Sequence, residues 1–179
     1  AAGRCFAGNA ALLGCSDEQP GRAPASGDAA AVAPSGAAPV PAVIPVDGAR
    51  TTAADSEPHN WLSHGRSYAE QRFSPLDRID TANVGRLGLA WSFDFPTDRG
   101  MEATPIVVDG RLYVTSTWSM VYAFEAKTGE LLWQHDPEVP RQWAVHLCCD
   151  AVNRGVAAWG GKVFVGTNND GLRDPALPN

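Results

Sequence analysis

The sequence predicts an all-β fold of short antiparallel strands arranged as the blades of a β-propeller. From His59 onward, short apolar runs alternate with turn residues, and two pairs of runs are joined by two-residue turns, as in β-hairpins. No stretch of this region shows sustained helical periodicity with caps at both ends. The segment LAWSFD at 89–94 is matched by LLWQHD at 131–136, 42 residues later. A period of roughly 40–50 residues with four strands each is typical of propeller blades.

The expected strands follow one another closely along the chain, at 105–108, 111–115, 119–124, 130–133, 155–159 and 162–167. Two-residue turns at Asp109-Gly110 and Gly160-Gly161 close the two hairpins, and a third turn includes Gly129. Chance similarity between short apolar segments is the alternative explanation of the repeat. The hairpin glycines Gly110 and Gly161, 51 residues apart, form a second match in the same order and weigh against chance.

Before this region the composition is that of a linker. Residues 16–58 are rich in Ala, Pro, Gly and Ser, with six of the chain's 14 prolines between Pro20 and Pro45, and no aromatic residue lies between Phe6 and Trp61. Proline removes backbone donors and small residues bury little surface, so ordering this stretch would not compensate its conformational entropy. We expect a disordered, semi-extended tether without chemical function.

The first residues, AAGRCFAGNAALLGC at 1–15, end in a segment that resembles a bacterial lipobox. In a lipobox a short apolar segment precedes a cysteine that becomes the lipidated first residue of the mature protein. On this interpretation residues 1–15 are a signal remnant and Cys15 carries a lipid anchor to the membrane. The alternative is that Cys5 and Cys15 are chance cysteines in a disordered leader.

The composition argues against two classes of protein. With 14 Lys and Arg against 20 Asp and Glu, the 179-residue chain has a formal charge of −6, whereas a nucleic-acid binder needs a clustered basic face. No apolar run approaches the roughly 18 residues of a membrane-spanning helix. We therefore expect no nucleic-acid partner and no polytopic membrane protein.

Four motifs give the β region a family resemblance. AFEAKTGELLW at 123–133 resembles the tryptophan-docking motif of quinoprotein propellers, in which the indole lies between blades, near the Gly-containing turn of the next motif. Three further family signatures follow in family order: WLSHGRSYAEQRFSP at 61–75, GMEATP at 100–105 and CCDAVNRG at 148–155. The chain resembles the methanol/ethanol dehydrogenases that use pyrroloquinoline quinone (PQQ). It is more similar to their haem-bearing, ethanol-oxidising members than to methanol dehydrogenase.

The resemblance implies that residues 59–167 form roughly one and a half blades of an eight-bladed propeller, as an N-terminal fragment. In the family a strand and another docking motif follow. Here the segment NNDGLRDPALPN at 168–179 loses strand character, so we expect an atypical, truncated tail.

Cys148 and Cys149 are the most informative pair of residues. Adjacent Cα atoms lie about 3.8 Å apart, less than the usual ~4.4–6.8 Å across a disulfide, and a bond between neighbours closes a strained eight-membered ring. Two buried thiols that merely neighbour each other are the alternative. The resemblance implies a disulfide that packs flat against the quinone ring system, and the flanking DAVNRG favours that interpretation.

Two charged residues complete the expected cofactor site. The resemblance makes Glu102 a hydrogen-bonding partner of the quinone, although a lone Glu is more often an exposed carboxylate at a strand edge. The guanidinium of Arg154 suits a polycarboxylate cofactor, since it pairs with carboxylates bidentately. The alternative for Arg154 is a surface ion pair.

Further residues of the signatures are expected to be structural. Val152 and Asn153 should shape the cofactor loop. We expect contacts between the N-terminal segment and the propeller from His64, Arg66, Gln71 and Arg72. We expect packing in the core or between blades from Trp118, Trp143 and Trp159.

The resemblance implies oxidation of a primary alcohol to an aldehyde. A carboxylate base removes the hydroxyl proton, hydride passes to the quinone, and calcium polarises the quinone carbonyl. The family's calcium ligands and catalytic base lie downstream of Asn179, so we expect no catalytic residue in this fragment and no activity from it alone. The aspartates Asp109, Asp150 and Asp170 do not match a family base.

The expected electron acceptor is a cytochrome or another periplasmic acceptor. The haem-attachment motif C-x-x-C-H does not occur in these residues, which leaves a c-type haem to a full-length protein. The vicinal disulfide and the leader predict a periplasmic location. A non-enzymatic outer-membrane propeller lipoprotein that acts as a scaffold is the alternative function. A sugar-oxidising quinoprotein is disfavoured by CCDAVNRG.

Overall fold

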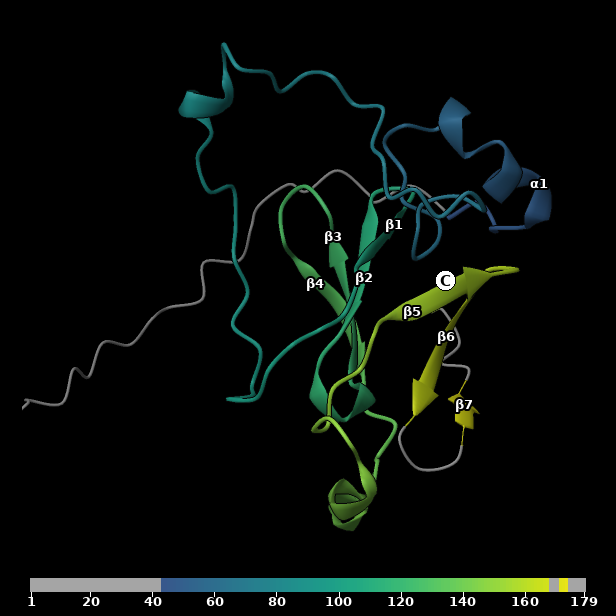
Figure 1. Cartoon of the computed structure of the whole chain (residues 1–179), viewed down its shortest axis with the longest axis vertical. Helices are drawn as coiled ribbons and strands as arrows, with labels where there is room; N and C mark the ends of the chain where they lie inside the picture. Colours follow the sequence, from purple (N-terminus) through teal and green to yellow (C-terminus); the bar gives the residue numbers. More distant parts are fainter. Residues whose placement is uncertain (1–42, 168–170, 174–179) are drawn as a thin grey trace, which may run out of the picture. The chain divides into compact units, whose positions relative to one another are not determined.

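The computed structural model describes residues 43–167 and 171–173, which form two antiparallel sheets (Figure 1). The first sheet is a four-stranded meander with the order β1-β2-β3-β4, as in one propeller blade. Its strands are Ile106–Val108, Arg111–Thr115, Val121–Glu125 and Leu131–His135. The second sheet has the order β5-β6-β7, with strands Val156–Trp159, Lys162–Thr167 and Gly171–Arg173.

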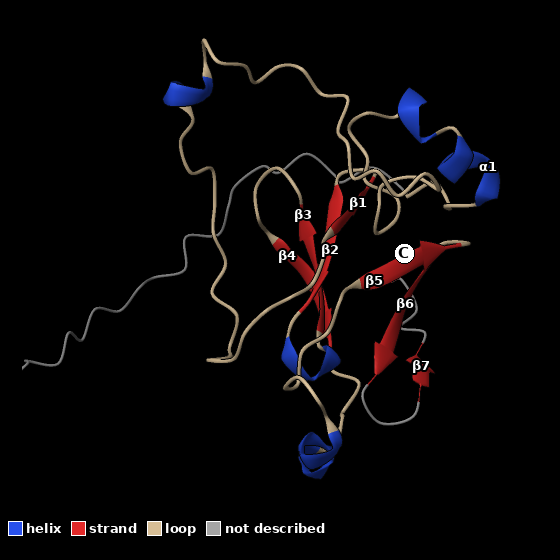
Figure 2. Cartoon of the chain, viewed as in Figure 1, coloured by secondary structure: helices blue, strands red, loops and turns tan. Residues whose placement is uncertain are grey.

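Helices are confined to short segments outside the sheets (Figure 2). The α-helix α1 is Gly48–Thr52, and the 3₁₀ helices are η1 Ala54–Ser56, η2 Val84–Arg86, η3 Thr117–Ser119 and η4 Arg141–His146. None of the helices in the described part of the chain is long and apolar enough to cross a membrane. The prediction of an all-β region from residue 59 is confirmed.

The two predicted hairpins are confirmed together with their turns. Asp109 and Gly110 have φ angles of 49° and 78°, and Gly160 and Gly161 have 57° and 79°. Positive φ at both central residues matches the right-handed twist of the flanking strands. The register that follows pairs Val108 with Arg111 in the first hairpin.

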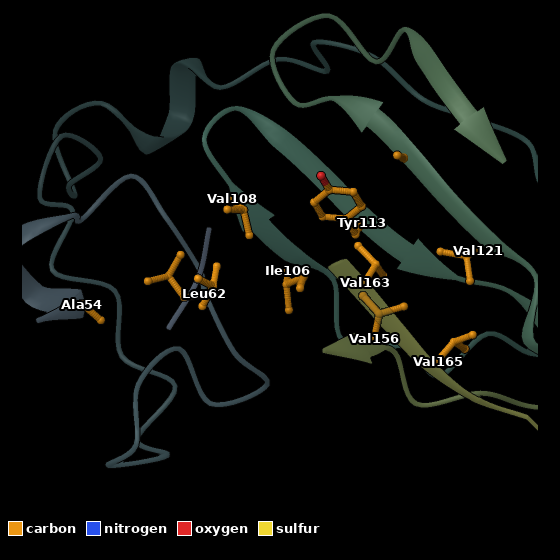
Figure 3. Packing of buried hydrophobic residues seen from close by; sticks show 11 residues of the cluster. Ala54, Leu62, Ile106, Val108, Tyr113, Val121, Val156, Val163 and Val165 are labelled. Atoms are coloured by element: carbon orange, nitrogen blue, oxygen red, sulfur yellow. The ribbon is translucent and has the colours of Figure 1, made fainter. Parts of the chain in front are cut away.

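The main core lies between the two sheets. Ile106, Tyr113 and Val121 of the first sheet and Val156 and Val163 of the second belong to one buried cluster. Figure 3 shows Val156 and Val163 close to Tyr113. The alternation of inward-facing residues along β2 and β3 leaves the opposite face of the first sheet for a second cluster.

That second cluster is aromatic. Tyr122 and Phe124 of β3 are buried, and Phe93 and Phe95 pack against them from the segment that precedes β1. The rings of Phe93 and Phe124 meet edge to face, with centroids 4.8 Å apart. The LAWSFD segment thus covers one face of the first sheet, against Tyr122 and Phe124 of β3.

Trp91 docks as the resemblance implies. Its Nε1 donates a hydrogen bond to the Ala126 carbonyl, 3.1 Å away, at the turn between β3 and β4. The same turn contains Gly129, with a φ of 77°. The tryptophan of one motif therefore lies against the glycine turn of the next.

The expectation of a disordered tether up to residue 58 is wrong for residues 43–58. Val46 and Ala54 are 3% and 2% exposed and belong to the main core. The Val46 carbonyl accepts a hydrogen bond from Gly160 N at 2.8 Å, and Asp47 caps α1 by accepting from Arg50 N at 2.7 Å. A few buried apolar residues and one helix cap are enough to order this stretch, although its average composition is that of a linker. Residues 16–42 and Cys15 lie outside the described residues.

Several strand boundaries also differ from the sequence predictions, by one or two residues. The third strand begins at Val121, since Trp118 and Ser119 have φ angles of 62° and 60° and cannot continue a strand. The fourth strand extends to His135. The expectation that residues 168–179 lose strand character is wrong for 171–173, which form β7. This strand pairs with β6, where Thr167 lies opposite Gly171.

Candidate cofactor site

The site lies at one end of the first sheet. Because this sheet is a meander, β1 and β3 begin there and β2 and β4 end there. The chain after β4 returns to the same end, where Thr104 and Gly155 form an isolated parallel bridge. Nearby, the backbone N of Trp118 donates to the Ala151 carbonyl at 2.9 Å. Segments that are distant in sequence therefore meet at this end, which we call the loop end of the sheet.

Glu102 and Arg154, predicted from different motifs, are brought together at the loop end. Arg154 Nη2 lies 3.0 Å from Glu102 Oε2, and the two side chains are 72% and 44% exposed. The Arg154 carbonyl accepts from Thr104 N at 3.1 Å, so the backbone under both side chains is tied together. The arrangement presents one cation and one anion side by side at the surface.

Gly155 allows this close approach. Its φ is 122°, and a Cβ at this position would meet the Thr104 carbonyl oxygen at 2.7 Å. A side chain would therefore force the loop away from the start of β1. The glycine that ends CCDAVNRG is what lets Arg154 reach Glu102.

The vicinal cysteines lie on the same loop, ahead of Arg154. The structure joins the sulfur atoms of Cys148 and Cys149, whose Cα atoms are 3.8 Å apart. Both residues are exposed, whereas the alternative interpretation of two neighbouring thiols assumed burial. A disulfide at the surface offers two polarisable sulfur atoms to a ligand.

An Arg–Trp–Arg group at the loop end was not predicted. The guanidinium carbons of Arg99 and Arg141 lie 5.4 and 4.2 Å from the ring centre of Trp118, within the range of cation–π contacts. Arg99 also forms an ion pair with Asp150. Asp150, which follows the disulfide, is thus the partner of Arg99 in an ion pair at the surface.

Trp118 and Trp159 were expected to pack in the core or between blades, and neither is a buried core residue in this structure. Trp118 is half-buried in the positive-φ turn η3, and Trp159 is 50% exposed. A signal was present for Trp118, since its neighbours Thr117 and Ser119 break the apolar alternation of a strand. The side chain of Trp143 lies outside the described part of the structure.

In the N-terminal signature, the hydrogen bonds of Arg66 lie within the N-terminal segment, whereas the sequence predicted contacts with the propeller. Arg66 is 4% exposed, and its guanidinium binds Asp55 Oδ1 at 2.7 Å and the Ala54 carbonyl at 3.1 Å. His64 and Arg72 contact each other at the surface, and Gln71 is exposed.

Within residues 43–167 and 171–173, no group of three or more His, Cys, Asp or Glu side chains is placed to hold a metal ion. The two carboxylates at the loop end, Glu102 and Asp150, are each paired with an arginine.

Comparison with known proteins gives a consistent result. Residues 61–172 match the family model "PQQ: Glucose/ethanol/alcohol dehydrogenase, beta-propeller domain". Quinohemoprotein alcohol dehydrogenase ADH-IIG of Pseudomonas putida is 59% identical over 133 residues, which are 74% of this chain and 18% of that protein. The chain therefore spans about a fifth of the length of this relative.

Solved structures of such proteins superpose on the chain. Quinohemoprotein alcohol dehydrogenase ADHIIG from Pseudomonas putida HK5 matches with a TM-score of 0.68 and 60% identity, over 70% of this chain and 19% of that one. A europium-containing methanol dehydrogenase matches with a TM-score of 0.62 and 39% identity, over 66% of this chain and 21% of that one.

Proposed function

Because the chain belongs to the family of PQQ-type glucose/ethanol/alcohol dehydrogenase β-propeller domains, we propose that its loop end holds PQQ in an enzyme that oxidises primary alcohols to aldehydes. The observation that carries the proposal is the surface at the loop end, where the Cys148–Cys149 disulfide shares a loop with Arg154, which is paired to Glu102. The chain spans only part of its relatives, so the activity is proposed for a protein that contains this chain.

The residues present fit a planar quinone that bears carboxylates. A guanidinium has five N–H donors, and the contact with Glu102 Oε2 at 3.0 Å uses one of them. The other donors of the exposed Arg154 side chain are available to a ligand carboxylate, which pairs with guanidinium bidentately. Glu102 can accept hydrogen bonds in the plane of the ring, and the exposed disulfide can pack against the ring face.

PQQ, when bound, supplies a two-electron acceptor for the hydride of the alcohol. The role of this chain is to bind and orient it. Arg154 would pair with carboxylates of the bound quinone, Glu102 would accept a hydrogen bond from it, and the disulfide would pack against it. Ordering a cofactor before the reaction is a large part of what a protein contributes to such chemistry. We assign the catalytic base and the calcium ligands to parts of the protein other than the described residues.

The proposal extends to the electron acceptor and the compartment. The name of ADH-IIG says that this relative is a quinohemoprotein, and we propose a haem, in a further domain or in a separate cytochrome, as the acceptor here. We also propose a periplasmic location. A disulfide between adjacent cysteines at the surface requires an oxidising compartment to persist.

A chimera tests the function. Residues 43–172 of this chain would replace the corresponding residues of ADH-IIG, and the purified apo-protein would be supplied with PQQ and calcium. We expect stoichiometric quinone binding in equilibrium dialysis and ethanol-dependent reduction of a dye. A folded chimera that bound no quinone would contradict the proposal and favour a scaffold function for this propeller.

A further inference from the structure

We propose that Asn153 is the positioning residue of the cofactor loop: its buried amide fixes the backbone that carries Arg154 and follows the Cys148–Cys149 disulfide. The inference rests on the proposed function, because it assigns a task at the same site. It concerns a buried residue, since Asn153 is only 9% exposed, while the proposed ligand contacts Arg154, Cys148 and Cys149 are exposed.

The amide of Asn153 uses all of its hydrogen-bonding capacity. Its Oδ1 accepts from Thr115 Oγ1 and from Gly155 N, both at 2.9 Å. Its Nδ2 donates to Ser119 Oγ at 3.0 Å and to the Gly166 carbonyl at 2.8 Å. An amide offers two lone pairs and two N–H groups, so every site is occupied. The orientation follows from the partners, since Gly155 N can only donate and the Gly166 carbonyl can only accept.

The four partners come from four different segments. Thr115 ends β2, Ser119 belongs to η3, Gly166 lies on β6, and Gly155 belongs to the cofactor loop itself. One side chain therefore joins the loop to both sheets. Within the described structure, the backbone on either side is tied as well, through Ala151 to Trp118 and through Arg154 to Thr104.

The contact with Gly155 is the one that concerns the ligand. It fixes the peptide directly after Arg154, at a glycine whose φ of 122° is outside the range of ordinary residues. The Arg154 side chain is 72% exposed and its ion pair with Glu102 is at the surface, where such pairs restrain a side chain weakly. The direction of Arg154 therefore depends on the backbone beneath it, and that backbone depends on Asn153.

A residue with only a structural role would affect stability but not the affinity of the folded protein for quinone. The test therefore measures both in the apo-form of the chimera described above. Asn153→Ala should lower the melting temperature and, at a temperature well below the transition, weaken PQQ binding about tenfold or more. The affinity is measured by equilibrium dialysis.

Asn60 offers a matched control. It is 3% exposed, and its amide binds Glu57 Oε2 at 2.6 Å and Asp109 N at 2.9 Å. It lies beside the turn between β1 and β2, at the opposite end of the first sheet. Asn60→Ala should lower the melting temperature as well, and it should leave the quinone affinity unchanged.

Asn153→Asp gives a signature that a general loss of stability does not. An ionised carboxylate at this position cannot donate a hydrogen bond to the Gly166 carbonyl. A protonated carboxyl group can donate to that carbonyl, and it can still accept hydrogen bonds from Thr115, Ser119 and Gly155. These partners are all uncharged, and burial favours the protonated form. At each pH, the PQQ affinity of Asn153→Asp is divided by that of the unsubstituted chimera. This ratio should rise toward one as the pH falls from 7.

Each outcome is decisive. If Asn153→Ala melts earlier but binds quinone as tightly as Asn60→Ala, the inference is wrong and the proposed function stands. If the unsubstituted chimera is folded but binds no quinone, the proposed function fails and the inference fails with it. Should Asn153→Ala not fold, Asn153→Asp decides alone, and a relative affinity that does not change with pH overturns the inference.

Discussion

Gly129 lies so close to Trp91 that a Cβ on this glycine would fall 2.5 Å from Cδ2 of the indole. Gly129 also has a φ of 77°, which is unfavourable for residues with a side chain. Two independent requirements, one conformational and one steric, therefore select glycine at this turn. Gly110 has nearly the same φ, 78°, but a Cβ there would meet nothing within 4 Å. The two glycines form a natural comparison.

The first prediction separates these requirements. Gly110→Ala should destabilise the chain by about 1–2 kcal/mol through the backbone alone. Gly129→Ala should cost about 1–3 kcal/mol more, because Trp91 must be displaced as well. Urea unfolding of the purified chain, followed by circular dichroism, measures both values.

Trp91→Leu provides the control for this comparison. In that background most of the extra cost of Gly129→Ala should vanish, since the two residues are in contact. Equal losses for Gly110→Ala and Gly129→Ala in the original background would show that the indole does not dock on the turn as the structure places it.

The second prediction concerns an ion-pair network at the opposite end of the sheet from the cofactor site. Arg50 binds Glu57 Oε2 at 2.7 Å and also pairs with Asp109 in the β1–β2 turn; the Arg50 and Asp109 side chains are 9% and 12% exposed. The hydrogen bond from Arg50 lowers the pKa of Glu57. Burial alone would raise the pKa of Asp109, but the hydrogen bonds from Arg50 and Ile44 N outweigh it, and the net shift is downward.

A carboxylate whose pKa is lower in the folded state stabilises the protein above its unfolded pKa, and this contribution is lost as the pH falls through the folded value. Unfolded Asp and Glu titrate near about 3.9 and 4.3. The stability of the chain should therefore be flat above about pH 5 and fall below pH 4 as Asp109 and Glu57 become protonated. Melting temperatures between pH 7 and pH 3 measure this dependence.

Asp109→Asn keeps a residue that tolerates the positive φ of the turn and removes its charge. It should cost about 1–3 kcal/mol near pH 7, less than the loss of a buried pair, because Glu57 remains as a partner of Arg50. The variant should also lose less stability on acidification. Asp77→Asn, at an exposed position, is the control, and a variant that matched it at every pH would contradict the role of the network.

These relationships show where sequence reasoning succeeds. Hairpins whose turns are Asp-Gly or Gly-Gly are predictable because the turn chemistry and the apolar alternation agree, as at Asp109-Gly110. Charged partners such as Glu102 and Arg154 came from the motifs of a family resemblance, and the structure adds that they contact each other.

Other features depend on contacts that a sequence does not display. Residues 43–58 have the composition of a linker, yet Val46 and Ala54 complete a core whose other residues are far away in the chain. Trp118 was expected to pack in the core or between blades, because tryptophan has a large apolar side chain. Its contacts with Arg99 and Arg141 arise only after the loop end has formed.

The third prediction concerns the vicinal cysteines. The chain has four cysteines, so the experiment uses a variant with Cys5→Ser and Cys15→Ser. After purification under oxidising conditions it should show no thiols on denaturation, and two after treatment with a reductant. Reduction should change the melting temperature little, because a bond between adjacent residues closes a minimal loop and constrains the unfolded chain only slightly. Two reactive thiols in the oxidised protein would show that Cys148 and Cys149 are not bonded to each other.

The fourth prediction tests the charge at the cofactor site in the chimera with ADH-IIG. Arg154→Ala removes hydrogen bonds from a cation to a ligand carboxylate, which are worth about 1.5–3 kcal/mol. Quinone affinity should fall by about one to two decades. Arg154→Lys should give an intermediate loss, since an ammonium keeps the charge without the planar fork of a guanidinium.

Lys127→Ala is the control for the loss of a positive charge. Lys127 is exposed in the turn between β3 and β4, and β3 ends and β4 begins at the end of the first sheet opposite to Arg154. A long-range effect of net charge would weaken quinone binding in both variants, and increasingly so at low ionic strength. A direct contact weakens it only in Arg154→Ala. If the two variants bind PQQ equally well, Arg154 does not contact the cofactor, and its ion pair with Glu102 is a surface interaction without a role in binding.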